Sequence, residues 1–337
     1  MKYQNLGRSG LKVSSVCLGA MMFGGRTEFS VAHQIVQIAR DAGINFVDTA
    51  DAYHCGASET MLGTILKDVR AEWIVASKVH NAMGDEPNQR GLSRYHILDA
   101  CDASLKRLGR DHIDLYYLHK EDPNTPLAET VRAMGHLLDL GKIRYWGVSN
   151  YRAWRIAAII RLCRELGVAE PVASQPLYNC LDRTAEVELL PCCSYFGLGV
   201  VPYSPLARGI LTGKYSSLGD PDPQTRAGQK DRRMLQTEWR QESLDIARQL
   251  RKHAQHQGTT LPAFSIAWLL NNRMIVAPIV GPRTVSQMKA YLEGLEYQFK
   301  AEDEAIVDEC VAAGHVSTHG YNDPAYPIEG RQSIVGS

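Results

Sequence analysis

The sequence has no excess of charge of either sign and no long apolar run. Lysine and arginine together number 37, and aspartate and glutamate also number 37, so the formal net charge is zero. Proteins that bind nucleic acid usually carry a basic surface, so this balance argues against that class while leaving room for a local anion pocket. No stretch of about 18 apolar residues occurs, which argues against a membrane span.

The sequence also lacks the features of an exported protein. Residues 1–6 contain no apolar segment of the kind that secretory signals need. The eight cysteines are dispersed without a C-x-x-C pair, and several lie in apolar stretches, as Cys17 does between Val16 and Leu18. Free, buried thiols are typical of reducing compartments. We therefore expect a cytoplasmic protein.

Common nucleotide and metal motifs are missing. No G-x-G-x-x-G follows a predicted strand, and no G-x-x-x-x-G-K-[ST] occurs, since residues 209–214 fail the spacing. The first predicted strand offers Cys17, Leu18 and Gly19 instead of a His-x-His pair, which disfavours a metal-dependent hydrolase. We expect no bound metal and no Rossmann domain.

Short apolar runs rich in β-branched residues are present and recur eight times, with helical periodicity between them. They are mostly unbroken, as in strands that are covered on both faces. This alternation predicts an α/β protein with a (β/α)₈ TIM barrel, and an open doubly wound sheet is the rival. We treat residues 1–337 as a single domain. The eight runs are 16–18, 44–47, 73–76, 113–118, 143–148, 171–174, 198–201 and 275–280.

Four parts of the sequence are additional to a minimal barrel of eight strands and eight helices. Residues 1–14 predict an N-terminal β-hairpin that could close the barrel floor. Residues 206–239 form a long loop after the seventh strand, and loops of that length are usually functional or disordered. Two helices, 244–256 and 262–271, precede the eighth strand, and an extra C-terminal helix, 302–313, leads into a tail at 314–337.

Polar residues end the predicted strands, where a barrel places its active site. Because these ends share one mouth, we expect the side chains to gather there. A carboxylate, an amine and an imidazole come from three adjacent strands and are close enough to perturb one another's titration. The polar ends are Asp48, Lys78, His119, Ser149 with Asn150, Gln175, and Tyr203 with Ser204.

The predicted cluster suits protonation of a carbonyl oxygen. Asp48 is placed to hold Lys78, whose charge would lower the pKa of the Tyr53 phenol and make it a proton donor. His119 would hydrogen-bond the same oxygen. The cluster has no source of electrons, so a cofactor is expected. A Schiff base on Lys78, as in class I aldolases, is the alternative chemistry.

Residues 281–284, with sequence Gly-Pro-Arg-Thr, follow the eighth strand and open a helix. Thr284 and Gln287 fit a capping box. Barrels often bind phosphate at this place, and Arg283 suits a phosphate monoester. An ordinary capped helix with a surface arginine is the alternative.

Asp48, Tyr53, Lys78 and His119 resemble the catalytic tetrad of the aldo-keto reductases, in matching order and strand context. The resemblance covers nearly the whole chain. Residues 46–53, 147–150 and 203–209 are each specific, and 203–209 with 211–215 resembles the branch that includes bacterial reductases and potassium-channel β subunits. It implies a barrel that reduces an aldehyde or ketone with NADPH, Tyr53 being the proton donor, and it leaves open a homo-oligomer.

The resemblance also implies contacts with NADPH/NADP⁺. Ser149, Asn150 and Gln175 would hold the nicotinamide carboxamide, and Tyr203 would stack on its ring. The segment 206–239 would clasp the pyrophosphate. The implied pyrophosphate contacts are Ser204, Pro205, Leu206, Ala207, Gly209 and Lys214; the ribose side is Gly19, Ala20 and Met21 with Asp48; and Gly281, Arg283 and Gln287 would meet the 2′-phosphate end.

Two positions depart from the family pattern. Ala290 and Tyr291 stand where the family often has an acidic residue and asparagine, so Tyr291 would stack on the adenine instead. His54 follows Tyr53 where glycine, serine or asparagine is common. With Met22, Tyr53 and His119, His54 would contact the substrate and favour polar or anionic molecules, unless it is a solvated loop residue. A slow, NADPH-binding redox-sensing or channel-associated subunit is the alternative function.

Overall fold

The computed structural model describes residues 1–219 and 221–328. Eight of its strands are parallel and form one sheet in the order β10-β3-β4-β5-β6-β7-β8-β9. All eight predicted strands are found, with shifts of a few residues at their ends. The strands are β1 Tyr3–Asn5, β2 Lys12–Ser14, β3 Cys17–Gly19, β4 Phe46–Asp48, β5 Ile74–Val79, β6 Ile113–Leu118, β7 Ile143–Ser149, β8 Ala173–Gln175, β9 Gly199–Val200 and β10 Ile279–Val280.

The sheet closes on itself. Val200 of β9 pairs in parallel with Ile275, and the amide of Val276 donates to the carbonyl of Val200 at 2.8 Å. On the other side β10 pairs with β3, with Ile279 opposite Cys17. These bonds join the two edges of the sheet and exclude the open doubly wound alternative, so the predicted (β/α)₈ barrel is confirmed.

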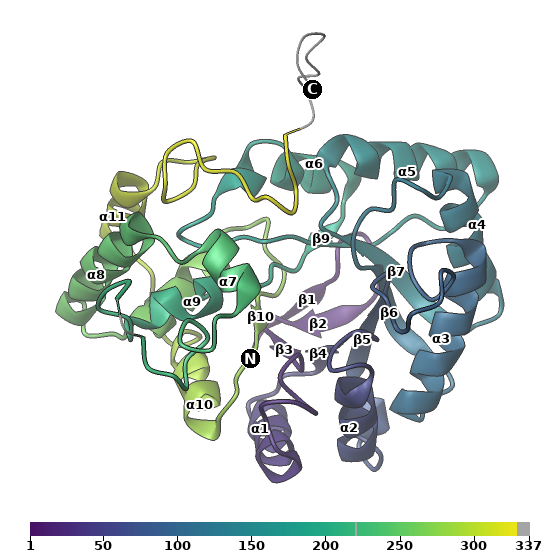
Figure 1. Cartoon of the computed structure of the whole chain (residues 1–337), viewed down its shortest axis with the longest axis horizontal. Coiled ribbons are helices and arrows are strands. Elements are labelled where there is room, and N and C mark those ends of the chain that lie inside the picture. The colour runs from purple at the N-terminus through teal and green to yellow at the C-terminus, as the bar shows by residue number, and fades with distance from the viewer. Residues whose placement is uncertain (220, 329–337) are drawn as a thin grey trace, which may run out of the picture.

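Helices surround the strands (Figure 1). Local signals fix their ends: in α3, Ser93 accepts the amide of His96 at the start, and Gly109 takes the left-handed conformation at the end. The helices are α1 Phe29–Asp41, α2 Ala57–Ile65, α3 Arg94–Leu108, α4 Leu127–Asp139, α5 Ala153–Leu166, α6 Leu189–Phe196, α7 Arg232–Thr237, α8 Gln241–His256, α9 Leu261–Asn271, α10 Val285–Glu293 and α11 Ala301–Cys310.

Apolar side chains fill both sides of the barrel wall. A small inner core contains Phe46, Leu115 and Val201, and a larger outer core packs strand residues such as Val47 and Val75 against the helices. Neighbouring residues of one strand, Phe46 and Val47, therefore enter different cores. This double burial explains why the strands read as unbroken apolar runs.

The N-terminal hairpin β1–β2 closes the floor of the barrel. Leu6 and Val13 are fully buried and belong to the inner core. Gln4 donates its side-chain amide to the carbonyl of Val276 at 2.6 Å. Gly7 has φ +59°, and a Cβ there would lie 2.5 Å from the carbonyl oxygen of Gly197, so only glycine fits this close approach. The hairpin blocks the floor, which leaves the opposite mouth for a ligand.

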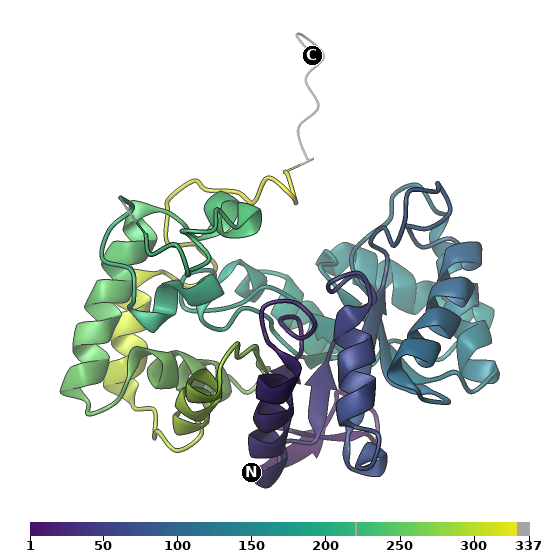
Figure 2. The same cartoon turned by 60° about the horizontal axis from the view of Figure 1, so that its bottom comes forward.

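The long segment after β9 is more ordered than a bare loop. It contains 3₁₀ turns at Ala207–Thr212 and the helix α7. The tail then returns along this side: Arg183 donates its amide to the carbonyl of His315, and Ser317 donates to the carbonyl of Leu181. Figure 2 shows both segments with α8 and α11 on one side of the molecule. The predicted tail beyond residue 328 lies outside the described residues.

Among residues 1–219 and 221–328, no helix is long and apolar enough to cross a membrane.

Candidate active site

Asp48, Tyr53 and Lys78 meet at the mouth of the barrel. Lys78 donates to the carboxylate Oδ1 of Asp48 at 2.5 Å and to the carbonyl of Thr49 at 2.7 Å. The distance from its Nζ to the hydroxyl of Tyr53 is 3.2 Å. Gln175 donates to the other oxygen of Asp48 at 2.9 Å. Three neighbouring segments thus bring the predicted group together, with Asp48 bonded at both oxygens.

Charge at this centre is stabilised by its partners. Burial alone would lower the pKa of Lys78, but Asp48 and the Tyr53 hydroxyl raise it above the ordinary value, so the amine stays protonated. Burial raises the pKa of Asp48, while Lys78 and Gln175 favour its carboxylate form. A lysine that stays protonated has no free electron pair with which to attack a carbonyl carbon, so the raised pKa of Lys78 disfavours the aldolase alternative.

The predicted lowering of the Tyr53 pKa is wrong. Burial raises this pKa above 10.0, and the opposing effect of Lys78 offsets only part of the rise. The sequence identified the cation but not the degree of burial. A raised pKa still suits the predicted role of Tyr53, because a proton donor must hold its proton until the substrate oxygen gains charge.

His119 completes the cluster as a neutral imidazole. Burial lowers its pKa well below 6.5, and the cations Lys78 and Lys120 lower it further. Asn81 donates its side-chain amide to Nδ1 of His119 at 3.3 Å, which leaves the imidazole proton on Nε2. The rings of Tyr53 and His119 lie 5.8 Å apart and nearly perpendicular. The centre therefore presents a hydroxyl and an N–H donor together.

These groups line a cavity of about 570 Å³. All but four of the predicted site residues line it, and the four are Ala20, His54, Lys78 and Ala207. Ala20, Lys78 and Ala207 are fully buried. His54 is exposed, and its ring lies over Gly25, where a Cβ would come within 2.0 Å of it. The structure thus places His54 on the loop surface beside the site.

Polar side chains and an aromatic ring form one wall of the cavity. Asn150 donates to the carbonyl of His119 at 3.0 Å, and its Oδ1 accepts the hydroxyl of Tyr203 at 2.8 Å. Ser149 donates to the carbonyl of Gln175 at 2.8 Å. These bonds join the ends of β7, β8 and the segment after β9, and they fix the Tyr203 ring against the polar wall.

The cavity is strongly cationic. Among the described residues, seven cations line it against one carboxylate, Asp48. Several crowd one another: burial together with Arg283 and Arg226 lowers the pKa of Lys214. Such crowding favours a bound anion. The seven are Arg26, Lys120, Arg208, Lys214, Arg226, Arg233 and Arg283.

The phosphate motif after β10 has the expected form with one change. Thr284 accepts the amide of Gln287 at the start of α10. The side chain of Gln287 accepts the amide of Arg283, at 2.8 Å, and not that of Thr284. Arg283 reaches across to the carbonyl of Gln224 in the long segment, at 3.0 Å. Residues 281–284 are therefore connected to the long segment after β9, across the part of the cavity where Lys214, Arg226 and Arg283 lie.

Strained backbone marks the start of the long segment. Ser204, Ala207 and Arg208 have φ between 45° and 56°, a region that costs residues with a side chain about 1–3 kcal/mol each. Gly209 follows with φ +106°, and a Cβ there would lie 3.3 Å from Nζ of Lys214. The surrounding structure must offset this strain to keep the segment along the cavity, and Gly209 leaves a bare backbone surface there.

Several cavity residues were not predicted individually, although the sequence indicated that the segments 22–26, 80–91, 119–124 and 315–326 decide the substrate. Asn81 lies two residues beyond the end of β5, so reading further past each strand end would have found it. The arginines of the long segment and the tail residues Ala325 and Tyr326 carry no local signal, because only the tertiary fold brings them to the mouth. Of the residues not predicted individually, Arg26, Asn81, Lys120, Ala325 and Tyr326 lie in those segments, and Arg208, Thr212, Gln224, Thr225, Arg226, Arg233 and Ile279 lie outside them.

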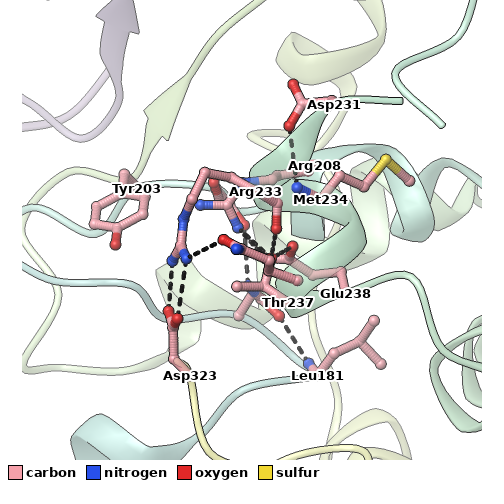
Figure 3. A network of polar contacts seen from close by, with 12 residues as sticks. Leu181, Tyr203, Arg208, Asp231, Arg233, Met234, Thr237, Glu238 and Asp323 are labelled. Atoms are coloured by element: carbon pink, nitrogen blue, oxygen red, sulfur yellow. Dashed lines mark hydrogen bonds and ion pairs between the residues drawn. The ribbon is translucent and has the colours of Figure 1, made fainter. Parts of the chain in front are cut away.

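A polar network connects the tail to α7 (Figure 3). Arg233 donates to both carboxylate oxygens of Asp323, at 3.0 and 2.5 Å, and Tyr321 donates to the carbonyl of Gln236 at 2.7 Å. Beside them Arg208 pairs with the buried carboxylate of Glu238. Because Arg233 and Tyr326 both line the cavity, this network holds the outer wall of the mouth.

We expect Asp323→Asn to loosen the tail without unfolding the protein. The Arg233–Asp323 pair is partly exposed, so its loss should cost about 1 kcal/mol and speed amide exchange in the tail roughly fivefold. Hydrogen exchange measured by mass spectrometry over residues 318–326 tests this. Asp245→Asn, which removes the surface partner of Arg248 on α8, is the control. Equal exchange in both variants would contradict a holding role for the pair.

Among residues 1–219 and 221–328, no group of three or more His, Cys, Asp or Glu side chains is arranged to hold a metal ion.

Comparison with known proteins identifies the class to which this barrel and its polar mouth belong. The model of the aldo/keto reductase family matches residues 15–312. The chain belongs to the aldo/keto reductase family.

Three similar proteins carry channel names. The chain is 36% identical over 301 residues to a "Probable voltage-gated potassium channel subunit beta" of Oryza sativa subsp. japonica, covering 88% of this chain and 92% of that protein. The protein of the same name in Arabidopsis thaliana is 35% identical over 301 residues, with the same coverage. A "Putative voltage-gated potassium channel subunit beta" of Schizosaccharomyces pombe (strain 972 / ATCC 24843) is 37% identical over 318 residues, covering 90% and 91%.

Proposed function

We propose that this protein is an NADPH-dependent carbonyl reductase that converts an aldehyde or ketone to an alcohol. One observation carries the proposal: the Tyr53 hydroxyl lies 3.2 Å from the ammonium of Lys78, beside a neutral His119, in the wall of a cation-lined cavity. A protonated phenol, a fixed cation and an N–H donor together suit a carbonyl oxygen that gains negative charge.

The residues that line the cavity suit NADPH. Crowded cations at one end suit the phosphates, with Arg283, Lys214 and Arg226 as the holding residues, and the bare backbone at Gly209 leaves room for them. At the other end, the amide side chains of Asn150 and Gln175 suit a carboxamide, and Tyr203 offers a ring face for the nicotinamide.

In this proposal bound NADPH supplies the hydride that goes, with its electron pair, to the carbonyl carbon. Tyr53 gives its proton to the carbonyl oxygen, so that the product is a neutral alcohol. Lys78 stabilises the phenolate left on Tyr53, and Asp48 holds Lys78 in place. Nε2–H of His119 donates to the same oxygen and orients it.

An aldehyde and ketone panel with NADPH and NADH tests the proposal. We expect oxidation of NADPH, followed at its absorbance, only when a carbonyl compound is present. We also expect NADPH to quench the intrinsic tryptophan fluorescence. The proposal would be abandoned if NADPH bound tightly and no carbonyl compound in the panel accelerated its oxidation.

The names of the relatives favour a second candidate, an NADPH-binding channel-associated or redox-sensing subunit with slow turnover. The intact set of Asp48, Tyr53, Lys78 and His119 supports reduction in either case. The rate of cofactor release separates the two. A fast single turnover followed by a steady state limited by NADP⁺ release would support the sensing role.

Arg283→Gln should weaken NADPH binding about 10- to 100-fold and leave NADH binding nearly unchanged. The reason is that Arg283 lies in the cationic end that suits a 2′-phosphate, and a hydrogen bond between charged groups contributes about 1.5–3 kcal/mol. Fluorescence titration with each coenzyme measures the effect. Arg273→Gln makes the same charge change at an exposed position outside the cavity. An equal loss of NADPH and NADH affinity would show that Arg283 does not bind the 2′-phosphate.

A further inference from the structure

Lys120 is a cation beside the reactive centre with no counter-ion. It directly follows His119, is half-buried and lines the cavity. His119 lines the same cavity, and the positive charge of Lys120 lowers the pKa of both His119 and His80. Among the described residues, Lys120 makes no side-chain hydrogen bond and no ion pair within 4 Å.

The acids nearest to Lys120 in the sequence have other partners. Glu121 accepts the amide of Arg152 at 2.8 Å and pairs with the guanidinium of Arg155 at 3.6 Å. Asp122 accepts the amides of Leu92 and Asn124 and the hydroxyl of Thr125. Both carboxylates therefore stabilise loops and leave the charge of Lys120 uncompensated.

The other cations that line the cavity are either paired or placed at the end that suits the phosphates of NADPH. Arg233 is bonded at both nitrogens to Asp323, and Lys78 is bonded to Asp48. Arg208 is paired with Glu238. Lys214, Arg226 and Arg283 belong to the end that suits the phosphates of NADPH, and Arg26 lowers the pKa of Arg226 there. Lys120 is thus the one cation near His119 that a substrate can reach without breaking an ion pair of the described structure.

We propose that the carbonyl substrate carries a carboxylate, which Lys120 binds at the mouth of the cavity. This inference rests on the proposed reductase function. One free ammonium matches the single charge of a carboxylate, whereas a phosphate dianion would need a second donor. His54, the sequence-based candidate for an anion contact, is exposed outside the cavity, so Lys120 takes that role.

Matched aldehydes test the preference. With saturating NADPH we expect kcat/KM for 4-carboxybenzaldehyde to exceed that for its methyl ester about tenfold or more. Lys120→Met should lower the value for the acid about 10- to 100-fold and leave the ester nearly unchanged. Lys120→Arg should keep the preference. Lys106→Met, at an exposed site on α3 outside the cavity, makes the same charge change and should have no effect.

A binding measurement separates this inference from the proposed function. Isothermal calorimetry with NADP⁺ present should show that 4-methylbenzoate binds about tenfold more tightly than 4-methylbenzamide, and that Lys120→Met removes the difference. If the protein reduced neither aldehyde but still discriminated these ligands, the reductase proposal would fail while the carboxylate site stood. Equal binding of both ligands to the unaltered protein, or unchanged discrimination in Lys120→Met, would overturn the inference.

Discussion

Replacing Tyr53 by phenylalanine is expected to lower kcat for carbonyl reduction about 10²- to 10⁴-fold, the usual contribution of a positioned proton donor. The substitution removes one hydroxyl, whose nearest cation is Lys78 at 3.2 Å. Lys78 keeps its bonds to Asp48 and to the carbonyl of Thr49, so the fold and the cofactor end should not change. NADPH affinity, measured by fluorescence quenching, should therefore match that of the unaltered protein.

Whether kcat or KM changes in Tyr53→Phe shows which step the hydroxyl serves. A proton donor acts only as the oxygen gains charge, so kcat should fall while KM changes little. Tyr95→Phe removes a hydroxyl from an exposed side chain on α3 and should retain full activity. Parental kcat in Tyr53→Phe would mean that another group, with His119 the nearest, delivers the proton.

Much of this centre can be predicted from sequence, because in a barrel the order of the strands along the chain determines which strand ends lie side by side. Asp48, Lys78 and His119 come from consecutive strands, and parallel strands in register deliver their ends to one mouth. The pairing of Asp48 with Lys78 then follows from charge alone. The fold itself was predictable for a similar reason, since burial in two cores leaves a simple unbroken apolar pattern in each strand.

The rest of the site depends on distances along the chain that no local pattern encodes. Arg233 and Asp323 are 90 residues apart, and Ala325 and Tyr326 reach the cavity only because the tail crosses back over the mouth. The prediction that the pKa of Tyr53 is lowered failed for another reason. The nearby cation could be read from the sequence, but the stronger effect of burial is a property of the packed structure. His54 shows the reverse case, a plausible neighbour that the backbone turns outward.

Replacing Lys78 by methionine should cost both stability and turnover, and a second substitution should separate the two. The side chains of Lys78 and Asp48 are 0% and 4% exposed, and removing one partner of a buried pair costs about 3–5 kcal/mol. Without its partner, Asp48 should bind a proton more readily in the folded than in the unfolded state. Its raised pKa then makes the unfolding free energy of Lys78→Met fall as the pH rises above about 4.

The double variant Asp48→Asn/Lys78→Met removes both charges and keeps an acceptor for the amide of Gln175. Urea unfolding at neutral pH should therefore show recovery of most of the lost free energy, with little dependence on pH, because a neutral pair does not titrate here.

Turnover should stay about 10²-fold or more below the parental rate in both variants. Without Lys78 the Tyr53 pKa rises further and nothing stabilises its phenolate, so the phenol becomes a poorer donor. Recovery of turnover together with stability would show that the ion pair only holds the fold, and that Tyr53 gives its proton without help from a cation.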